Sequence, residues 1–252
     1  MATLTTIIPD ARFLPIANPN GNNLTQLHIY NTNTRTQNNG GQCCCWIVPA
    51  NVLWAKFEMW GGGGAGAGAC CCMQPNPSAG SSPYARRTLK VTPGQFYNVC
   101  AASSTCCISW CGGAPGYPSF ACGGTNGTAL ALCVSGGCNG IAQCFQGYGD
   151  CRGCGTCITG QVSGHDFAMC GLTGSVHSTN CGYDSWTYWP QPTYIGGGQL
   201  MSRDYCLQQS GADADWTSVF PGGGSRGGVG VNVDQINCGT AGAGGLVIIT
   251  YK

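Results

Sequence analysis

The sequence contains few charged side chains. The 252 residues include 10 Lys and Arg, 9 Asp and Glu and 3 His, so charged residues make up 8% of the chain against about 25% in ordinary proteins. These counts leave few groups for acid–base chemistry, and a net charge of +1 offers no footprint for nucleic acid. No apolar run approaches the roughly 18 residues that a membrane span needs. We therefore expect no enzyme, no cofactor, no nucleic-acid partner and no membrane insertion.

Cysteine, by contrast, is abundant, with 21 residues in the chain. Such density normally marks an oxidising location, where disulfides supplement a small core. Within the triplets 43–45 and 70–72, consecutive residues of a strand point to alternate faces, so their partners should differ. An odd total leaves at least one cysteine unpaired or paired with another subunit. The predicted disulfide cysteines are Cys43, Cys44, Cys45, Cys70, Cys71, Cys72, Cys100, Cys106, Cys107, Cys111, Cys122, Cys133, Cys138, Cys144, Cys170, Cys181, Cys206 and Cys238.

A metal site is the alternative use for one group of cysteines. Cys151, Cys154 and Cys157 form a C-x-x-C-x-x-C motif, and His165 follows. This spacing suits zinc or an iron–sulfur cluster. Similar spacings also arise by chance in a cysteine-rich chain, and the second C-x-x-C pair of a zinc ribbon is missing. A soluble metal-binding protein therefore stays open as an alternative to the disulfide interpretation.

Hydrophobic periodicity predicts strands and no helices. Strands are expected at residues 44–48, 52–60, 87–92, 95–101 and 246–251, with shorter ones at 27–30, 129–134 and 141–145. In residues 52–60 a period of two separates Phe57 and its inward neighbours from Lys56 and Glu58 on the outer face. Pro93 and Gly94 suit the centre of a type II turn. The last strand should pair centrally with the strands near residue 50.

These elements divide the chain into two parts. Residues 1–42 contain no cysteine and many Asn and Thr, which indicates a docking or oligomerisation arm, or a disordered tail. Residues 43–252 form one glycine- and cysteine-rich β domain. Its fold class is all-β, a β-sandwich or jelly-roll-like frame with a large, irregular, disulfide-tied insertion.

Four segments, in order, carry a family resemblance: WIVPANV (46–52), FEMWGGGG (57–64), LKVTPGQFYNV (89–99) and AGAGGLVIITY (241–251). They resemble the glycine-rich proteins of bacteriophage tail fibres and related virion appendages. The resemblance implies a non-enzymatic structural protein on the virion surface, either a fibre or adhesin subunit or a capsid decoration protein. It also implies a homo-oligomer, with a trimer favoured, and attachment to other virion proteins through residues 1–42.

The resemblance also bears on the glycine-rich part and on the compartment. In that family the glycine-rich part packs as bundled polyproline-II-like helices. The glycine runs here are short and interrupted by cysteine, so a disulfide-tied loop region is the alternative.

Residues 1–10 lack the cationic start and apolar core of a secretory signal. A virion protein would explain both the abundant cysteine and the missing signal, because it is made in the host cytoplasm and oxidises after release. A missing propeptide or non-classical export would explain them equally well.

The densest aromatic stretch is the candidate receptor site. Its residues are Tyr183, Asp184, Trp186, Tyr188, Trp189 and Tyr194. The rings would stack on sugars of a host surface glycan, or contact a host protein, while Asp184 bonds hydroxyl groups. The alternative is that these rings supply core volume, because each buries 150–250 Å². A secreted, disulfide-rich lectin is a further alternative for the whole chain.

Overall fold

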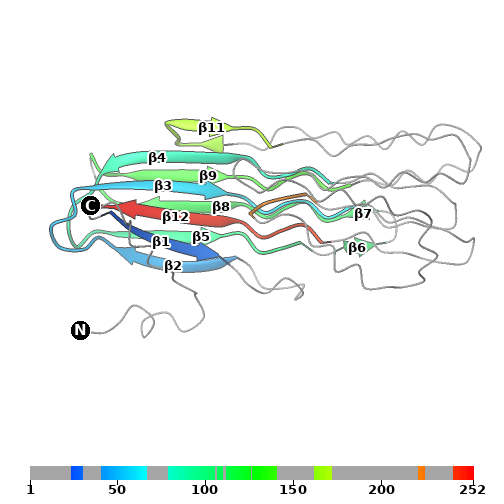
Figure 1. Ribbon diagram of the computed structural model, residues 1–252, viewed down its shortest axis with the longest axis horizontal. Helices are drawn as coiled ribbons and strands as arrows, with labels where there is room; N and C mark the ends of the chain where they lie inside the picture. The colour runs from blue at the N-terminus through cyan, green and yellow to red at the C-terminus, as the bar shows by residue number, and fades with distance from the viewer. Residues whose placement is uncertain are drawn as a thin grey trace, which may run out of the picture.

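The computed structural model describes residues 24–30, 41–66, 79–105, 107–109, 112–125, 127–140, 162–171, 221–224 and 241–252. This part of the chain forms two five-stranded antiparallel sheets that face each other (Figure 1). Sheet A has the order β1 (Thr25–Tyr30), β12 (Leu246–Tyr251), β3 (Trp54–Trp60), β4 (Tyr84–Lys90) and β11 (Phe167–Met169). Sheet B has the order β10 (Val162–Ser163), β9 (Leu130–Val134), β8 (Ser119–Gly123), β5 (Phe96–Ala101) and β2 (Gln42–Ile47). The all-β, sandwich-like prediction is confirmed.

Two further short strands, β6 (Cys107–Ser109) and β7 (Gly112–Gly113), pair with each other outside the sandwich. The described residues contain no helix of the length and apolarity needed to cross a membrane.

The core lies between the sheets and is built by alternation along each strand. In β3 the side chains of Ala55, Phe57 and Met59 are buried, as predicted. Lys56 and Glu58 point outward and form an ion pair of 2.7 Å. The centre of the core is aromatic, because the Phe57 ring of sheet A lies 5.5 Å from the Tyr97 ring of sheet B. Such ring contacts add specific geometry to the large apolar area that each ring buries.

The chain's last strand occupies the interior of sheet A. β12 pairs with β1 on one side and β3 on the other, so Ile249 lies between Leu27 and Phe57. This confirms the central position predicted for residues 246–251. β1 comes from the segment expected to serve as an arm, and it forms an edge strand of the sandwich. Docking by residues 1–42 stays a prediction.

Two turns close the frame at the same end. The Gln95 N–H donates to the Thr92 carbonyl over 3.1 Å, and Gly94 has φ +80°. This is the geometry of a type II turn, in which the third residue needs a left-handed conformation. Asn51 has φ +69° in the turn between β2 and β3, a conformation that Asn tolerates better than most residues.

Beyond the strands, the glycine segments continue side by side toward the other end of the molecule (Figure 1). Residues 61–65 lie among them and donate to several neighbours. The Gly62 N–H donates to the Tyr117 carbonyl over 2.9 Å, and the Ala65 N–H donates to the Ala114 carbonyl over 2.8 Å. Every third residue of 61–65 thus donates to the same neighbouring segment, the one that contains Ala114 and Tyr117.

The two residues between Gly62 and Ala65 donate hydrogen bonds to other segments. The Gly63 N–H donates to the Ala243 carbonyl over 2.8 Å, and the Gly64 N–H donates to the Gly80 carbonyl over 3.1 Å. A period of three with hydrogen bonds only to other segments is typical of polyproline-II helices, which form no internal hydrogen bonds. The described glycine segments therefore form a bundle of this kind, which we call the glycine bundle.

Glycine is required here by space. A Cβ atom on Gly63 would overlap the carbonyl oxygen of Gly223, and one on Gly64 would overlap that of Cys138. Neither residue has a left-handed φ, so the constraint is the close approach of neighbouring backbones rather than an unusual conformation. Substitution therefore has to push two main chains apart.

We expect Gly63→Ala to lower the free energy of unfolding by about 1–3 kcal/mol or more, because this is the usual cost of overpacking a filled interior. Gly244→Ala is the matched control, because its Cβ would meet nothing closer than the Ala102 carbonyl oxygen at 3.2 Å. Denaturant unfolding of both variants under the same oxidising conditions measures the difference. Equal losses in the two variants would contradict the close-packed bundle.

Candidate functional site

Two features of the described residues have the character of a site. One is a groove at the end of the sandwich opposite the glycine bundle. The other is the outward face of sheet B, which carries the cysteines of β2, β5, β8 and β9. The first is a hollow with an exposed aromatic ring, and the second is a flat surface with exposed thiols.

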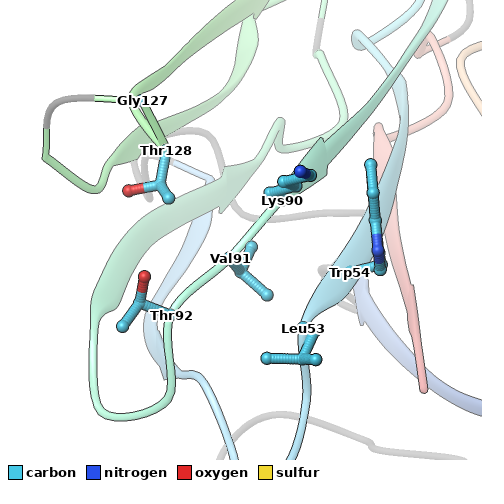
Figure 2. A pocket seen from close by; sticks show the side chains of 7 residues that line it. All are labelled: Leu53, Trp54, Lys90, Val91, Thr92, Gly127 and Thr128. Carbon is cyan, nitrogen blue, oxygen red and sulfur yellow. The ribbon is translucent and has the colours of Figure 1, made fainter.

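The groove has a volume of about 410 Å³ and is open to solvent (Figure 2). It lies between the start of β3, the end of β4 and the turn before β9. Its lining residues are Leu53, Trp54, Lys90, Val91, Thr92, Gly127 and Thr128. Trp54 is half exposed at 50%, and the Lys90 ammonium lies 5.5 Å from the centre of its ring. This is the distance of a cation–π contact.

The groove has little polar chemistry of its own. The Thr128 hydroxyl lies 2.8 Å from Gln95 Oε1 and 3.0 Å from the Thr125 carbonyl, so it is already engaged. The Lys90 amine, the Thr92 hydroxyl and the Trp54 indole N–H are the other polar side-chain groups of the lining. No carboxylate, thiol or imidazole belongs to it. The groove therefore suits a ligand that stacks on an indole ring, and it lacks the groups for acid–base catalysis.

The sequence contained one signal for this groove. The alternation in residues 52–60 places Trp54 on the outer face, where a large aromatic side chain is unusual unless something covers it. The remaining lining residues come from two turns that only the folded chain brings together. No local motif marks them.

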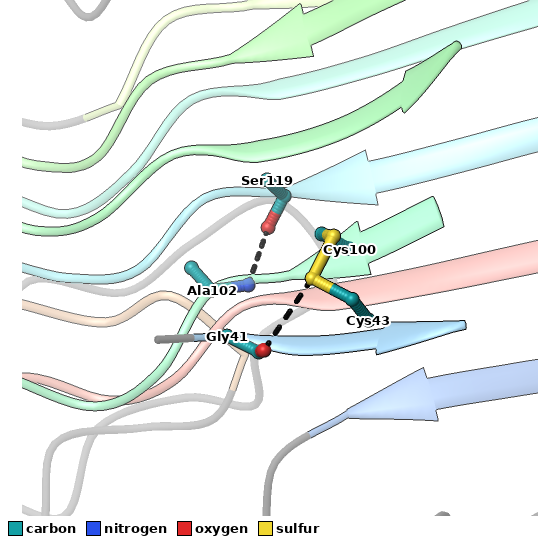
Figure 3. Close-up of a disulfide and its surroundings, with 5 residues drawn as sticks. All are labelled: Gly41, Cys43, Cys100, Ala102 and Ser119. Atoms are coloured by element: carbon teal, nitrogen blue, oxygen red, sulfur yellow. Dashed lines mark hydrogen bonds between the residues drawn. A yellow bond between two sulfur atoms is a disulfide. The ribbon is translucent and has the colours of Figure 1, made fainter. Parts of the chain in front are cut away.

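Cys43 and Cys100 form a disulfide between β2 and β5 (Figure 3). They are directly opposed in the antiparallel pair, with Cα atoms 4.0 Å apart and a sequence separation of 57. Beside it, the Ala102 N–H donates to Ser119 Oγ over 2.9 Å. The Ser119 hydroxyl in turn donates to the Trp60 carbonyl of sheet A over 2.6 Å. The disulfide joins two strands of one sheet, and Ser119 joins the two sheets.

The first cysteine triplet alternates between faces, as predicted. Cys43 and Cys45 are on the outward side of β2, and Cys44 packs against the core. Cys122 of β8 and Cys133 of β9 are also exposed on this outward side. We call this surface the cysteine face. Its exposed thiols are Cys45, Cys122 and Cys133, and its exposed apolar side chains are Ile47, Phe96 and Phe120.

The other predicted disulfide cysteines fall into three groups. Cys44, Cys45, Cys122, Cys133 and Cys170 have free thiols in this structure. Cys138 lies in the glycine bundle, where its carbonyl accepts from the Gly80 N–H, and Cys107 begins β6. Outside the described residues are Cys70, Cys71, Cys72, Cys106, Cys111, Cys144, Cys181, Cys206 and Cys238.

The predicted metal and receptor residues are largely outside the described part of the chain. This holds for Cys151, Cys154 and Cys157, and for the whole aromatic stretch 183–194. His165 is described and exposed. In the described ranges no three His, Cys, Asp or Glu side chains are placed to hold a metal ion.

Asp166 has a structural role. Its carboxylate forms a 2.6 Å ion pair with Arg87 and accepts from the Thr88 N–H over 2.7 Å. Its own N–H donates to the Arg86 carbonyl over 2.9 Å. These contacts fasten the turn before β11 to β4, so Asp166 is occupied in holding an edge strand.

Burial raises the pKa of Cys44 to about 11, with a smaller contribution from neighbouring Cys45. The thiolate is the reactive form of cysteine. At pH 8 the thiolate population of Cys44 is therefore more than about 100-fold below that of an ordinary thiol.

We expect iodoacetamide at pH 8 to alkylate exposed Cys45 long before Cys44 in the folded protein. Fragment-ion mass spectrometry of the peptide that contains both residues measures the two rates. Unfolding in denaturant should abolish the difference, because it removes the burial that raises the pKa. Equal rates in the folded protein would show that Cys44 is not held against the core.

No known protein-family model matches this chain, and no curated protein sequence matches it.

Proposed function

We propose that the protein is a non-enzymatic structural protein of a bacteriophage virion, working as a fibre or adhesin subunit or as a capsid decoration protein. The observation that carries this proposal is the glycine bundle that continues from the sandwich. Its segments are held by main-chain hydrogen bonds such as that from Gly62 to Tyr117. Such a bundle leaves almost no side chains for chemistry, and it gives a stiff extension of the β frame.

The segments that resemble the phage proteins build this combined unit. Residues 57–64 run from β3 into the bundle, and residues 241–251 run from the bundle into β12. Residues 89–99 form the end of β4, the Pro93–Gly94 turn and most of β5. The resemblance therefore coincides with the sandwich and its junction to the bundle, which supports its use as a guide to function.

The structure of the sandwich suits a particle outside the cell. A disulfide ties β2 to β5, and the strands of sheet B carry no charged residue. Stability therefore depends little on pH-sensitive ion pairs in that sheet. In this proposal the protein lies on the virion surface as a homo-oligomer, and residues 1–42 attach it to other virion proteins.

Purified particles of the phage that encodes the chain provide the test. We expect antibodies raised against the folded protein to label an appendage or the capsid surface in electron micrographs. Peptides of the chain should also be present in the particles in fixed proportion to the major capsid protein. A chain found in infected cells but absent from washed particles would overturn the proposal.

Adhesion to a host surface is the more specific role within this proposal, and the Trp54 groove is the described site that favours it. An indole ring with Lys90 beside it and open solvent in front can stack on a sugar ring. The sequence offers residues 183–194 as the competing site. The two sites can be separated by substitution, because Trp54 belongs to the sandwich frame and is 50% exposed.

We expect Trp54→Ala to reduce adsorption of the purified protein to host cells by about tenfold or more, the loss of a good stacking contact. Phe167→Ala, which removes an exposed ring from the edge strand β11 outside the groove, is the control. The double variant Trp186→Ala/Trp189→Ala tests the competing stretch in the same assay. Full adsorption by a folded Trp54→Ala protein would exclude the groove as the receptor site.

A further inference from the structure

The two outward faces of the sandwich differ in charge. All charged residues in the described strands are on β3 and β4 of sheet A, in the segments WAKFEMW and YARRTLK. The strands of sheet B under the cysteine face contain none. The cysteine face instead carries exposed Ile47, Phe96 and Phe120, with exposed fractions of 62%, 58% and 38%.

An uncharged face suits contact with its own copy. In a two-fold contact the same surface meets itself, so a face whose charges are mainly of one sign repels its own copy. The outward face of sheet A has an excess of cations, since Arg86 and Lys90 are exposed there beside the internal Lys56–Glu58 pair. The cysteine face has no such repulsion and has apolar side chains to bury.

Cys122 is placed where a covalent link between two such faces could form. β8 is the third of the five strands in sheet B, so Cys122 and Phe120 lie on the central strand of the face. A two-fold axis that passes β8 near Cys122 brings this residue opposite its own copy and keeps Phe120 close to its own copy. Stacked sheets cross at about 30°, so residues near the axis stay aligned while those on outer strands diverge. Stacked sheets lie about 10 Å apart on average, and a disulfide spans Cα atoms up to about 7 Å apart, so the two sheets have to lie closer together at Cys122, as at the inter-sheet disulfide of immunoglobulin domains.

The size of the face explains why a covalent link would be needed. Four strands about 4.8 Å apart, with about five residues of about 3.3 Å each, cover roughly 300 Å² per copy. Stable interfaces bury about 800 Å² per partner. The contact alone is therefore weak, and it serves to align the thiols.

We propose that two copies of the chain associate through the cysteine face and are joined by a disulfide between Cys122 and Cys122 of the second copy. This proposal deepens the proposed homo-oligomer and rests on it, but not on the virion role. It favours a pair over the trimer implied by the resemblance, since a flat face can stack on the same face of another copy only about a two-fold axis.

The oxidant belongs to the class of small-molecule disulfides, with glutathione disulfide as the probe. The Cys122 thiolate attacks one sulfur of glutathione disulfide and releases the first glutathione thiolate. The Cys122 thiolate of the second copy then attacks the protein sulfur of this mixed disulfide and releases the second. Two protein thiols and one glutathione disulfide give one protein disulfide and two glutathione thiols, which take up the two protons.

The experiment incubates the reduced and refolded full chain with glutathione disulfide and follows dimers on non-reducing gels. Wild-type protein should form a dimer, and a chymotryptic digest, which cuts after Phe120 and Leu130, should contain the Cys122-linked peptide pair. Cys122→Ser should lose the dimer. Cys133→Ser and Cys170→Ser remove other exposed thiols and should keep it.

A charge variant tests whether the face, and not random collision, aligns the thiols. Phe120→Lys should slow dimer formation by about tenfold or more, because association would bury two like charges. Thr88→Lys adds the same charge to the exposed face of sheet A and should have no effect. The thermal midpoint of each variant confirms that it is folded.

Five results would overturn the proposal. They are a wild-type chain that stays monomeric, a dimer linked through other cysteines, a Cys122–glutathione adduct with no dimer, equal rates for Phe120→Lys and Thr88→Lys, and a trimer with Cys122 unlinked. None of these outcomes alters the result of particle labelling, so failure of this inference and failure of the virion role are distinguishable.

Discussion

The close approach of glycine main chains is the constraint on which the rest of the structure depends. Gly63 and Gly64 lie so near the backbones of other segments that a Cβ has no place, and their N–H groups donate to Ala243 and Gly80. Every buried N–H and C=O has to find a partner. In the bundle these partners come from segments far apart in sequence, so the segments have to enter together and in fixed register.

The β-sandwich supplies that register. β3 and β12 are paired with Trp60 opposite Leu246, and the chain passes directly from this pair into the contact of Gly63 with Ala243. Buried Ser119 then ties the end of β3 to the end of β5, because its hydroxyl donates to Trp60 and accepts from Ala102. The apolar and aromatic core thus fixes the positions of the strand ends, and the strand ends fix the register in which the glycine segments pack.

Sequence alone predicted the strands with regular alternation and the turns with turn-specific residues. β3 and β12 are rich in β-branched and aromatic residues, and Gly94 stands where a type II turn needs it. β8 was not predicted, because its segment SFACG has small residues and lies among glycines. Its alternation of Phe120 and Cys122 outward with Ser119 and Ala121 inward becomes visible only beside β5 and β9.

The candidate site was less predictable for a physical reason. The groove is formed by Trp54, the end of β4 and the turn before β9, and no local spacing encodes the meeting of three separate segments. The glycine bundle poses the same difficulty. The three-residue period of N–H donors exists only between assembled backbones, and the short glycine runs interrupted by cysteine pointed instead to a disulfide-tied loop region.

Cysteine in the described part of this chain is chiefly a surface residue. The Cys43–Cys100 disulfide links neighbouring strands that are already joined by ladder hydrogen bonds, so it reinforces one sheet and does not hold the two sheets together. That task falls to Phe57, Trp46 and Tyr97, whose rings meet between the sheets. Because the core does not need Cys45, Cys122 and Cys133, their thiols are left on an uncharged outer face. The covalent chemistry of the described sandwich is therefore directed outward, where it can act between molecules, while glycine and aromatic packing hold each molecule together.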